Sequence, residues 1–259
     1  MFYSVDLSSV STLIQSAAFL ALLSPLHAEP LPFGTPACSG PHREFADRSY
    51  FLLCYDSSRK VPAWVGYELT PARLVRRAAR PSHFRSDPDL SSSANDADYL
   101  HSGYTRGHMA PAADFAFSDQ AIRRTFLLSN VIPQPRRVNC GRWAQLENAV
   151  RRIAADADSV VVFTGSIFES KHTEFIGDGK VSVPTHAVKV ILARKGDRKT
   201  MFAAIVPNTD EAMAPLQHFA TTVDEVERRT GLDFFAALDD AEEQKLESSL
   251  QPFPASVRN

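Results

Sequence analysis

The stretch Tyr104-Thr105-Arg106-Gly107-His108-Met109-Ala110-Pro111 is the most informative in the chain. The imidazole of His108 titrates near neutral pH and can accept a proton from water. Arg106 can bind a phosphate oxygen, and Gly107 allows close approach of the backbone. Alone, an Arg-Gly-His sequence is a weak signal, because a histidine at the end of a strand is usually structural or simply exposed.

Two runs further along the chain carry amide and carboxylate side chains. The first contains Asn130 and Gln134, and the second contains Asn139 and Glu147. Such oxygens are the ligands that hard divalent cations prefer. Asn139 also suits the N-cap of a helix, and Glu147 could instead pair with Arg151 four residues later. On a regular helix Asn139 and Glu147 would lie roughly 80° apart, so both could face one site only approximately.

The distribution of charge is more informative than its total. The 259 residues carry a net charge of −2, with 44% hydrophobic and 22% charged residues, as in ordinary soluble proteins. Residues 73–152 contain 13 arginines, no lysine and 7 acidic residues, a balance of +6, whereas residues 153–259 contain 11 basic and 17 acidic residues, a balance of −6. The basic middle fits either a polyanion-binding face or a solvated arginine-rich surface. Arginine without lysine favours phosphate, because the guanidinium fork matches its oxygens.

The N-terminus resembles an export signal. Residues 12–23 form an apolar core of signal-peptide length, and Ala28 supplies a small residue for cleavage. The segment before this core contains Asp6 and no basic residue, so a buried N-terminal helix is the alternative. We expect residues 1–28 to be removed and residues 29–259 to form a single exported domain, periplasmic or secreted. The core is short for a membrane span, so no membrane partner is expected.

Hydrophobic periodicity predicts both strands and helices. Strands are expected over residues 49–55, 63–69, 160–165, 181–192 and 201–206, the first two joined as a hairpin. Helices are expected over residues 118–125, from about 139 through Ile153, and from a capping box at Thr222 to Gly231. Residues 29–48 are expected to be an extended lead-in, and residues 81–98 a long surface loop. Strands do not alternate regularly with helices, which predicts an α+β fold.

Three cysteines are present. Cys38 and Cys54 both lie near the expected mature N-terminus and are the expected disulfide pair of an exported protein. Cys140 would then be single, and no second cysteine or histidine stands beside it at zinc-ligand spacing.

Three strings together are specific: Gly-Tyr-x-Arg-Gly-His-Met-Ala-Pro from Gly103, Ser-Asn-x-x-Pro-Gln from Ser129, and Asn-x-x-x-Trp-x-x-Leu-Glu from Asn139. This combination resembles the DNA/RNA non-specific endonucleases, which are ββα-metal nucleases. The resemblance extends from about Cys38 to Phe235. It implies a central, mainly antiparallel sheet flanked by helices.

The resemblance also implies the chemistry of the site. His108 would be the general base that activates water, and Asn139 the direct protein ligand of a hydrated Mg²⁺, for which Mn²⁺ could substitute. Glu147 would orient the waters of the metal ion. Arg106 would lie beside the scissile phosphate, and Asn130 would supply a supporting amide.

An upstream arginine usually contacts phosphate in this family. We assign that role to Arg80, although Arg77 and Arg85 lie close in the sequence. The implied substrates are DNA and RNA, cleaved with little sequence specificity to leave a 5′-phosphate. Nothing is implied about an inhibitor protein or an oligomeric state.

One residue departs from the family pattern. The usual motif is Asp-Arg-Gly-His, and Thr105 stands where the aspartate is expected. This change alters the charge of the pocket and therefore bears on its affinity for metal. Thr105 suggests one alternative, a catalytically weakened homologue that binds nucleic acid. A second alternative, independent of Thr105, is a phosphoesterase of another class that uses His108 on non-nucleotide substrates.

Overall fold

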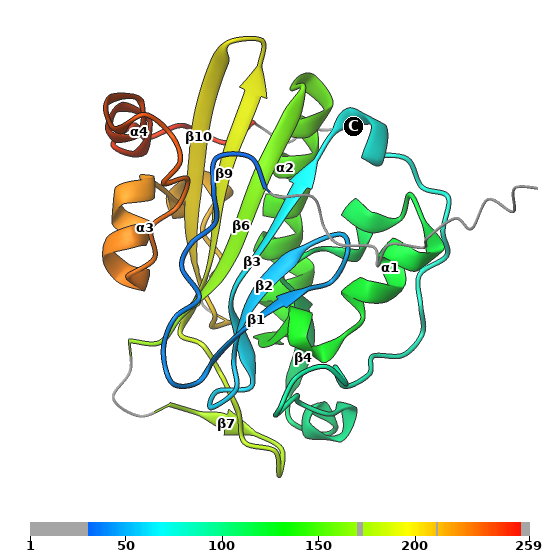
Figure 1. Cartoon of the computed structure of the whole chain (residues 1–259). Coiled ribbons are helices and arrows are strands. Elements are labelled where there is room, and N and C mark those ends of the chain that lie inside the picture. The colour runs from blue at the N-terminus through cyan, green and yellow to red at the C-terminus, as the bar shows by residue number, and fades with distance from the viewer. Residues whose placement is uncertain (1–30, 170–172, 211, 255–259) are drawn as a thin grey trace, which may run out of the picture.

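A computed structural model describes residues 31–169, 173–210 and 212–254 (Figure 1). The predicted signal segment 1–28 lies outside these residues. Among the helices that are described, none combines the length and apolar character required to cross a bilayer.

The core is a seven-stranded sheet in which all neighbouring strands pair antiparallel. This arrangement confirms the predicted α+β class with a mainly antiparallel sheet. In spatial order the strands are β1 (Arg43–Asp47), β2 (Leu52–Asp56), β3 (Val61–Leu69), β6 (Ser159–Ile167), β9 (His186–Lys195), β10 (Arg198–Pro207) and β11 (Ala220–Thr221).

Helices cover both faces of the sheet (Figure 1). One face carries α2 (Ala144–Asp156), α1 (Asp119–Thr125) and a two-stranded ribbon of β4 (Tyr104–His108) and β5 (Val131–Pro135). The other carries α3 (Val223–Thr230) and α4 (Asp240–Glu247). Successive side chains of a strand point to opposite faces. Along β9, Val190 accordingly packs in the cluster under α3, whereas Ile191 packs in the cluster with α2.

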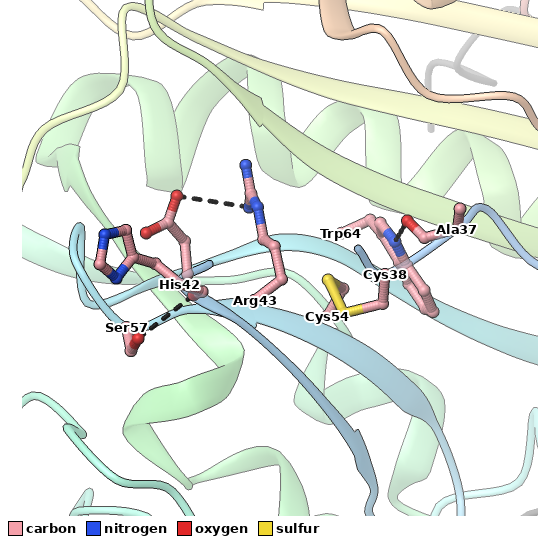
Figure 2. Close-up of a disulfide and its surroundings, with 8 residues drawn as sticks. Ala37, Cys38, His42, Arg43, Cys54, Ser57 and Trp64 are labelled. Carbon is pink, nitrogen blue, oxygen red and sulfur yellow. Dashed lines mark hydrogen bonds and ion pairs between the residues drawn. A yellow bond between two sulfur atoms is a disulfide. The ribbon is translucent and has the colours of Figure 1, made fainter. Parts of the chain in front are cut away.

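The predicted hairpin and disulfide are both confirmed. Strand β2 pairs with β3, with an irregularity in register between Cys54 and Tyr55. Cys38 is bonded to Cys54 and ties the lead-in to β2, close to Trp64 (Figure 2). Cys140 is free and exposed, as predicted.

Two predicted segments were wrong in part. The lead-in of residues 29–48 contains the edge strand β1, and the predicted strand 181–192 is divided into β8 (Val181–Ser182) and β9. Pro184 explains the division, because proline lacks a backbone N–H and restricts the residue before it. Strand β8 pairs instead with β7 (Phe175–Ile176).

All residues between β3 and β6 form one excursion from the sheet. Since β3 and β6 are direct neighbours, residues 70–158 leave the sheet and return beside the same strand. The excursion contains 3-10 turns at Pro71–Arg73, Asp96–Tyr99, Ala112–Phe115 and Leu128–Asn130. Its predicted loop, 81–98, is largely irregular and is anchored by the buried carboxylate of Asp87, which accepts a 2.7 Å hydrogen bond from Arg48 Nε.

The predicted helix ends agree at three positions. Ser118 caps α1, Thr222 accepts a hydrogen bond from Glu225 N at the start of α3, and Gly231 ends α3 with a φ of 68°. The carboxylate of Glu225 pairs with Arg228. Only one of the two hydrogen bonds of a capping box is therefore formed in the described structure, the one from Glu225 N to the Thr222 hydroxyl.

The helix predicted from about residue 139 is not regular. A π-helical segment spans Val138–Trp143, and Gly141 within it has φ −105° and ψ −106°, so regular α-helix begins at Ala144. The 80° separation predicted for Asn139 and Glu147 therefore does not apply. The N-cap position of the segment is Arg137, so Asn139 is not the cap.

Candidate active site

His108 ends β4 and is enclosed by aromatic rings. Its ring centroid lies 5.1 Å from those of Phe84 and Phe126, and only 7% of the residue is exposed. Within the described chain, Nε2 is buried without a hydrogen-bond partner. Burial and, secondarily, the charge of Arg80 lower the pKa of His108 to about 3. The imidazole is therefore neutral at pH 7.

Gly107 is required by packing rather than by backbone conformation. A Cβ at this position would overlap the side chain of Gln134, which lies across it from β5. Strand β4 pairs with β5 in the register Gly107↔Ile132 and His108↔Val131. Glycine in the motif thus lets β5 close over β4 and holds His108 at the end of the ribbon.

The amide of Asn139 is oriented by Thr105. Asn139 Nδ2 donates to Thr105 Oγ1 at 2.9 Å and approaches the Arg106 carbonyl oxygen at 3.5 Å. The Thr105 hydroxyl donates to the Gln134 carbonyl oxygen at 2.8 Å. A hydroxyl has one hydrogen, so Thr105 can only accept from Asn139. This bond directs Asn139 Oδ1 away from Thr105 and leaves it available as a ligand.

Glu147 lies in the first turn of α2 and is partly buried. Burial raises the pKa of Glu147 to about 7, while the charge of Lys189 opposes that rise. Arg151, the alternative partner considered for Glu147, binds Asp114 at 2.6 Å and Asn148 at 2.7 Å instead. The charges of Lys189 and Arg151 nevertheless oppose the rise in the pKa of Glu147, without a direct ion pair between Arg151 and Glu147.

Lys189 has no exposed surface. Its Nζ donates to Thr164 Oγ1 at 2.7 Å and lies 4.9 Å from the centroid of the Trp143 ring. Burial lowers the pKa of Lys189 to about 8, and the nearby charge of Glu147 favours its ionised form. Lys189 lies within the Cys38–Phe235 region of the family resemblance, but the sequence predicts no role for it.

Two of the predicted phosphate-binding arginines lie near His108. Arg80 Cζ is 5.0 Å from the Phe126 ring centroid, and its charge lowers the pKa of both His108 and Glu147. Arg106 Cζ is 5.0 Å from the Tyr99 ring, and its Nη2 lies 2.6 Å from Asp96 Oδ1. The structure therefore brings Arg80 and Arg106 to the same aromatic-walled region as the imidazole.

For the other two candidates, Arg77 and Arg85, the main chain forms hydrogen bonds with neighbouring segments. The main chain of Arg77 donates to the Ala116 carbonyl oxygen, and that of Arg85 forms hydrogen bonds with Phe126 and Leu128. Neither guanidinium contributes to the pKa shift of His108. Arg80 remains the best assignment for the upstream arginine.

Asn130 is fully buried, and its amide is engaged with the backbone. Its Oδ1 accepts from Ala110 N at 2.9 Å, and its Nδ2 donates to the carbonyl oxygens of Ala110 and Thr125 at 2.9 and 3.0 Å. These bonds position the chain immediately after His108. The geometry supports the predicted role as a supporting amide and offers no group for direct catalysis.

The donor set suits a hard divalent cation. Asn139 Oδ1 and the Glu147 carboxylate are both oxygen donors, and Thr105 directs the first of them outward. Next to Asn139 is a depression of about 610 Å³. It is lined by Arg136, Arg137, Cys140, Gly141, Arg142, Ala212 and Met213. Three of these residues are arginines, of which Arg136 and Arg137 directly follow β5 and Arg142 belongs to the π-helical segment.

This arrangement is that of the ββα-metal class. It combines the two strands β4 and β5 with helix α2, a histidine at the end of β4 and an asparagine whose amide oxygen is free within the described residues. The model of the DNA/RNA non-specific endonuclease family matches residues 30–241, so the chain belongs to that family of divalent-metal-dependent nucleases. The match contains the whole Cys38–Phe235 region in which the resemblance was found.

Similar proteins agree with this membership. Nuclease C1 of Cunninghamella echinulata is 37% identical and aligns over 83% of this chain and 91% of its own length. Mitochondrial endonuclease G of Bos taurus is 34% identical over 78% of this chain and 75% of its own length. The crystal structure of the EndoG/EndoGI complex superposes with a TM-score of 0.72 and 30% identity, covering 80% of this chain and 90% of that one.

The mitochondrial nuclease EXOG of Danio rerio is longer than the shared region. It is 37% identical over 80% of this chain, but the chain spans 64% of its length. The common part includes the entire ribbon and helix described above.

Proposed function

We propose that this protein hydrolyses phosphodiester bonds of DNA and RNA with little sequence specificity, using Mg²⁺, or Mn²⁺ in its place. The Thr105–Asn139 hydrogen bond carries this proposal, because it leaves Asn139 Oδ1 free as a direct metal ligand. Glu147 would hold the metal through water. Thr105 thus orients the Asn139 amide without the negative charge of the usual aspartate.

His108 is the proposed general base. Its Nε2 is enclosed among aromatic rings, which leaves Nδ1 to take the proton from the attacking water. The lowered pKa keeps the ring neutral, while the enclosure fixes its orientation. When bound, Mg²⁺ would supply Lewis-acid stabilisation of the phosphate and the leaving oxygen. Asn130 would maintain the backbone geometry behind His108.

Arg80 and Arg106 are the proposed phosphate-binding residues. Arg106 would exchange its contact with Asp96 for a phosphate oxygen, since the Asp96 side chain is 47% exposed and can rotate away. The exposed Arg136 and Arg137 would bind the backbone further along the strand. Contacts of this kind read the backbone and carry no base sequence. Binding should therefore weaken steeply as salt concentration rises.

Export of a single mature domain, residues 29–259, is also a proposal. The Cys38–Cys54 disulfide supports it, because such bonds persist in oxidising compartments. Mitochondrial relatives make an organelle the alternative destination. N-terminal sequencing of protein recovered from cell fractions tests the proposal, since an intact Met1 in the cytosolic fraction would contradict it.

Digestion of circular plasmid with and without EDTA tests the proposed chemistry. Wild-type protein should nick the circles only with the divalent ion, and Asn139→Ala should lose most activity. Gln145→Ala, on the exposed side of α2, is the matched control and should behave as wild type. Undiminished cleavage by purified protein in excess EDTA would refute metal dependence.

The same samples separate the alternatives. A weakened homologue would bind labelled DNA without nicking the plasmid. A phosphoesterase of another class would hydrolyse a chromogenic monoester faster than DNA. The proposal expects cleavage of DNA and RNA and little turnover of the monoester.

A further inference from the structure

Three acidic side chains of α3 and α4 converge. These two helices lie on the face of the sheet opposite to α2 and the β4–β5 ribbon (Figure 1). The three side chains are Asp224 and Glu227 of α3 and Glu247 at the end of α4. One carboxylate oxygen of each lies within 4.8 Å of the others. Ca²⁺ binds oxygen at about 2.4 Å, so oxygens on opposite sides of one ion lie about 4.8 Å apart. All three oxygens can therefore belong to one coordination sphere.

Glu247 supplies an independent indication that something binds here. The residue is 7% exposed, and within the described chain its Oε1 is buried without a hydrogen-bond partner. A buried carboxylate oxygen without a partner is strongly unfavourable, and native proteins normally satisfy such atoms with water or an ion. Glu243, one turn earlier in α4, has a buried and unpartnered Oε1 as well.

The charge around Glu247 is not compensated by protein cations. Burial and the charges of Glu227, Glu243, Asp224 and Asp233 raise the pKa of Glu247 to about 8. Every neighbouring charge that acts on this carboxyl is negative.

The nearby cations pair with other groups. Their closest ion pairs are Arg228 with Glu225, Arg229 with Glu169, and Lys199 with Glu242. Lys245, the remaining cation of α4, is exposed. Among the described residues no ion pair joins a basic side chain to Asp224, Glu227 or Glu247, so the converging carboxylates lack a paired counter-charge.

We propose that Asp224, Glu227 and Glu247 form a Ca²⁺ site that joins α3 to α4. All the donors are oxygens, and their angles are set by two separate helices, which suits the flexible geometry of Ca²⁺ better than the strict octahedron of Mg²⁺. Glu227 is already positioned, because its Oε1 accepts a 2.7 Å hydrogen bond from Phe234 N after α3. The site is separate from the proposed nuclease chemistry and stabilises the fold.

Thermal unfolding of the full chain, stripped of metal and then titrated with Ca²⁺ at pH 8, tests the proposal. At a hundredfold excess of Ca²⁺ over its Kd, the Tm of wild type should rise by roughly 5–10 °C. Asn139→Ala should show the same rise, because its substitution lies at the other metal position. Glu247→Gln should show little rise and should lose one Ca²⁺ equivalent by isothermal titration calorimetry.

The Tm values of the metal-free proteins show whether Glu247→Gln still folds. Glu247→Gln removes a crowded negative charge, so its metal-free Tm should equal or exceed that of wild type, and its Mg²⁺-supported nuclease activity should be unchanged. A wild-type Tm that does not respond to millimolar Ca²⁺ would overturn the proposal. So would an equal response in Glu247→Gln, or stabilisation of wild type by mild acidification alone, which would identify a shared proton as the occupant.

Discussion

The two faces of the sheet bury different kinds of side chains. Between the sheet and helices α3 and α4 the core is apolar and aromatic, with Phe163 packed 5.5 Å from Phe234 and 5.4 Å from Phe235, and the buried Glu247 lies between the two helices. Under α2 and the β4–β5 ribbon the interior also contains Lys189 and Asp114, which are fully or almost fully buried. Burying charged groups costs stability unless they are paired, so we expect this second face, which carries the proposed chemistry, to contribute less to stability than the apolar face.

The difference separates two tasks. The apolar face can stabilise the sheet without constraining the site, whereas each polar group of the other face supports a particular residue. Tyr67 and Arg151 hold Asp114, and Thr105 holds Asn139. We expect substitutions on the α2 face to change catalysis and stability together, and substitutions on the α3 face to change stability alone.

Removal of the His108 ring should have the largest effect. His108→Gly should reduce nicking by about 10²–10⁴-fold, because the general base is lost. The slot between Phe84 and Phe126 should admit free imidazole, which should restore part of the rate as the pH rises. Exposed His101, where glycine suits the φ of 56°, provides the control His101→Gly. A folded His108→Gly protein with near-full activity would place the base elsewhere.

Lys189 and Val190 compare the two faces on one strand. Lys189→Met should destabilise the protein by about 3–5 kcal/mol, because it leaves buried acidic groups without their cation. Loss of the charge should also raise the pKa of Glu147 further and move the pH–activity profile upward. Val190→Ala should cost about 2 kcal/mol and leave the profile unchanged. Urea unfolding and pH–rate curves measure both, and identical profiles for wild type and Lys189→Met would contradict the assignment.

Thr105 tests the orientation of the metal ligand. Thr105→Val keeps the shape but loses the acceptor for Asn139, so Mn²⁺ affinity should fall about 10–100-fold. Thr105→Ser keeps the hydroxyl and should remain close to wild type. Electron paramagnetic resonance of free Mn²⁺ gives the affinity without a reaction. Equal affinities for the valine and serine variants would show that the hydroxyl does not orient the amide.

The last expected effect is on acid stability. His108 has a pKa of about 3 in the folded protein and about 6.5 when unfolded. Its contribution to stability is present above pH 6.5 and is lost as the pH falls toward 3, because only the unfolded chain then binds the proton. His108→Phe should remove about 1.4 kcal/mol per pH unit from the slope of unfolding free energy between pH 6 and 4. Parallel curves for the two proteins would contradict the lowered pKa.

The parts predicted from sequence were those with a local signal. Periodicity located the Trp143–Ile153 helix face, and the motif strings located His108, Asn139 and Glu147. Strand β1 was missed because residues 29–48 are rich in Pro, Gly and Ser, although it pairs with the next strand, β2. The kink at Gly141 was missed because the backbone dihedral angles of a single residue leave no mark on apolar periodicity. The pairing of Asp114 with Arg151 joins residues 37 positions apart and has no local signature. The hydrogen bond between Asn139 and Thr105 joins residues 34 positions apart, so the proposed orienting role of Thr105 has no local signature either.

The direct pairing of β3 with β6 has an evolutionary consequence. Nearly all of the proposed chemistry lies in residues 70–158, a segment whose two ends meet at adjacent strands. Such a segment can be inserted, exchanged between homologues or diversified while the sheet keeps its order. Lys189 is the exception, since it reaches the excursion from β9 outside the segment. Chimeras that exchange residues 70–158 should therefore inherit the activity of the donor only when the recipient sheet keeps a lysine at position 189.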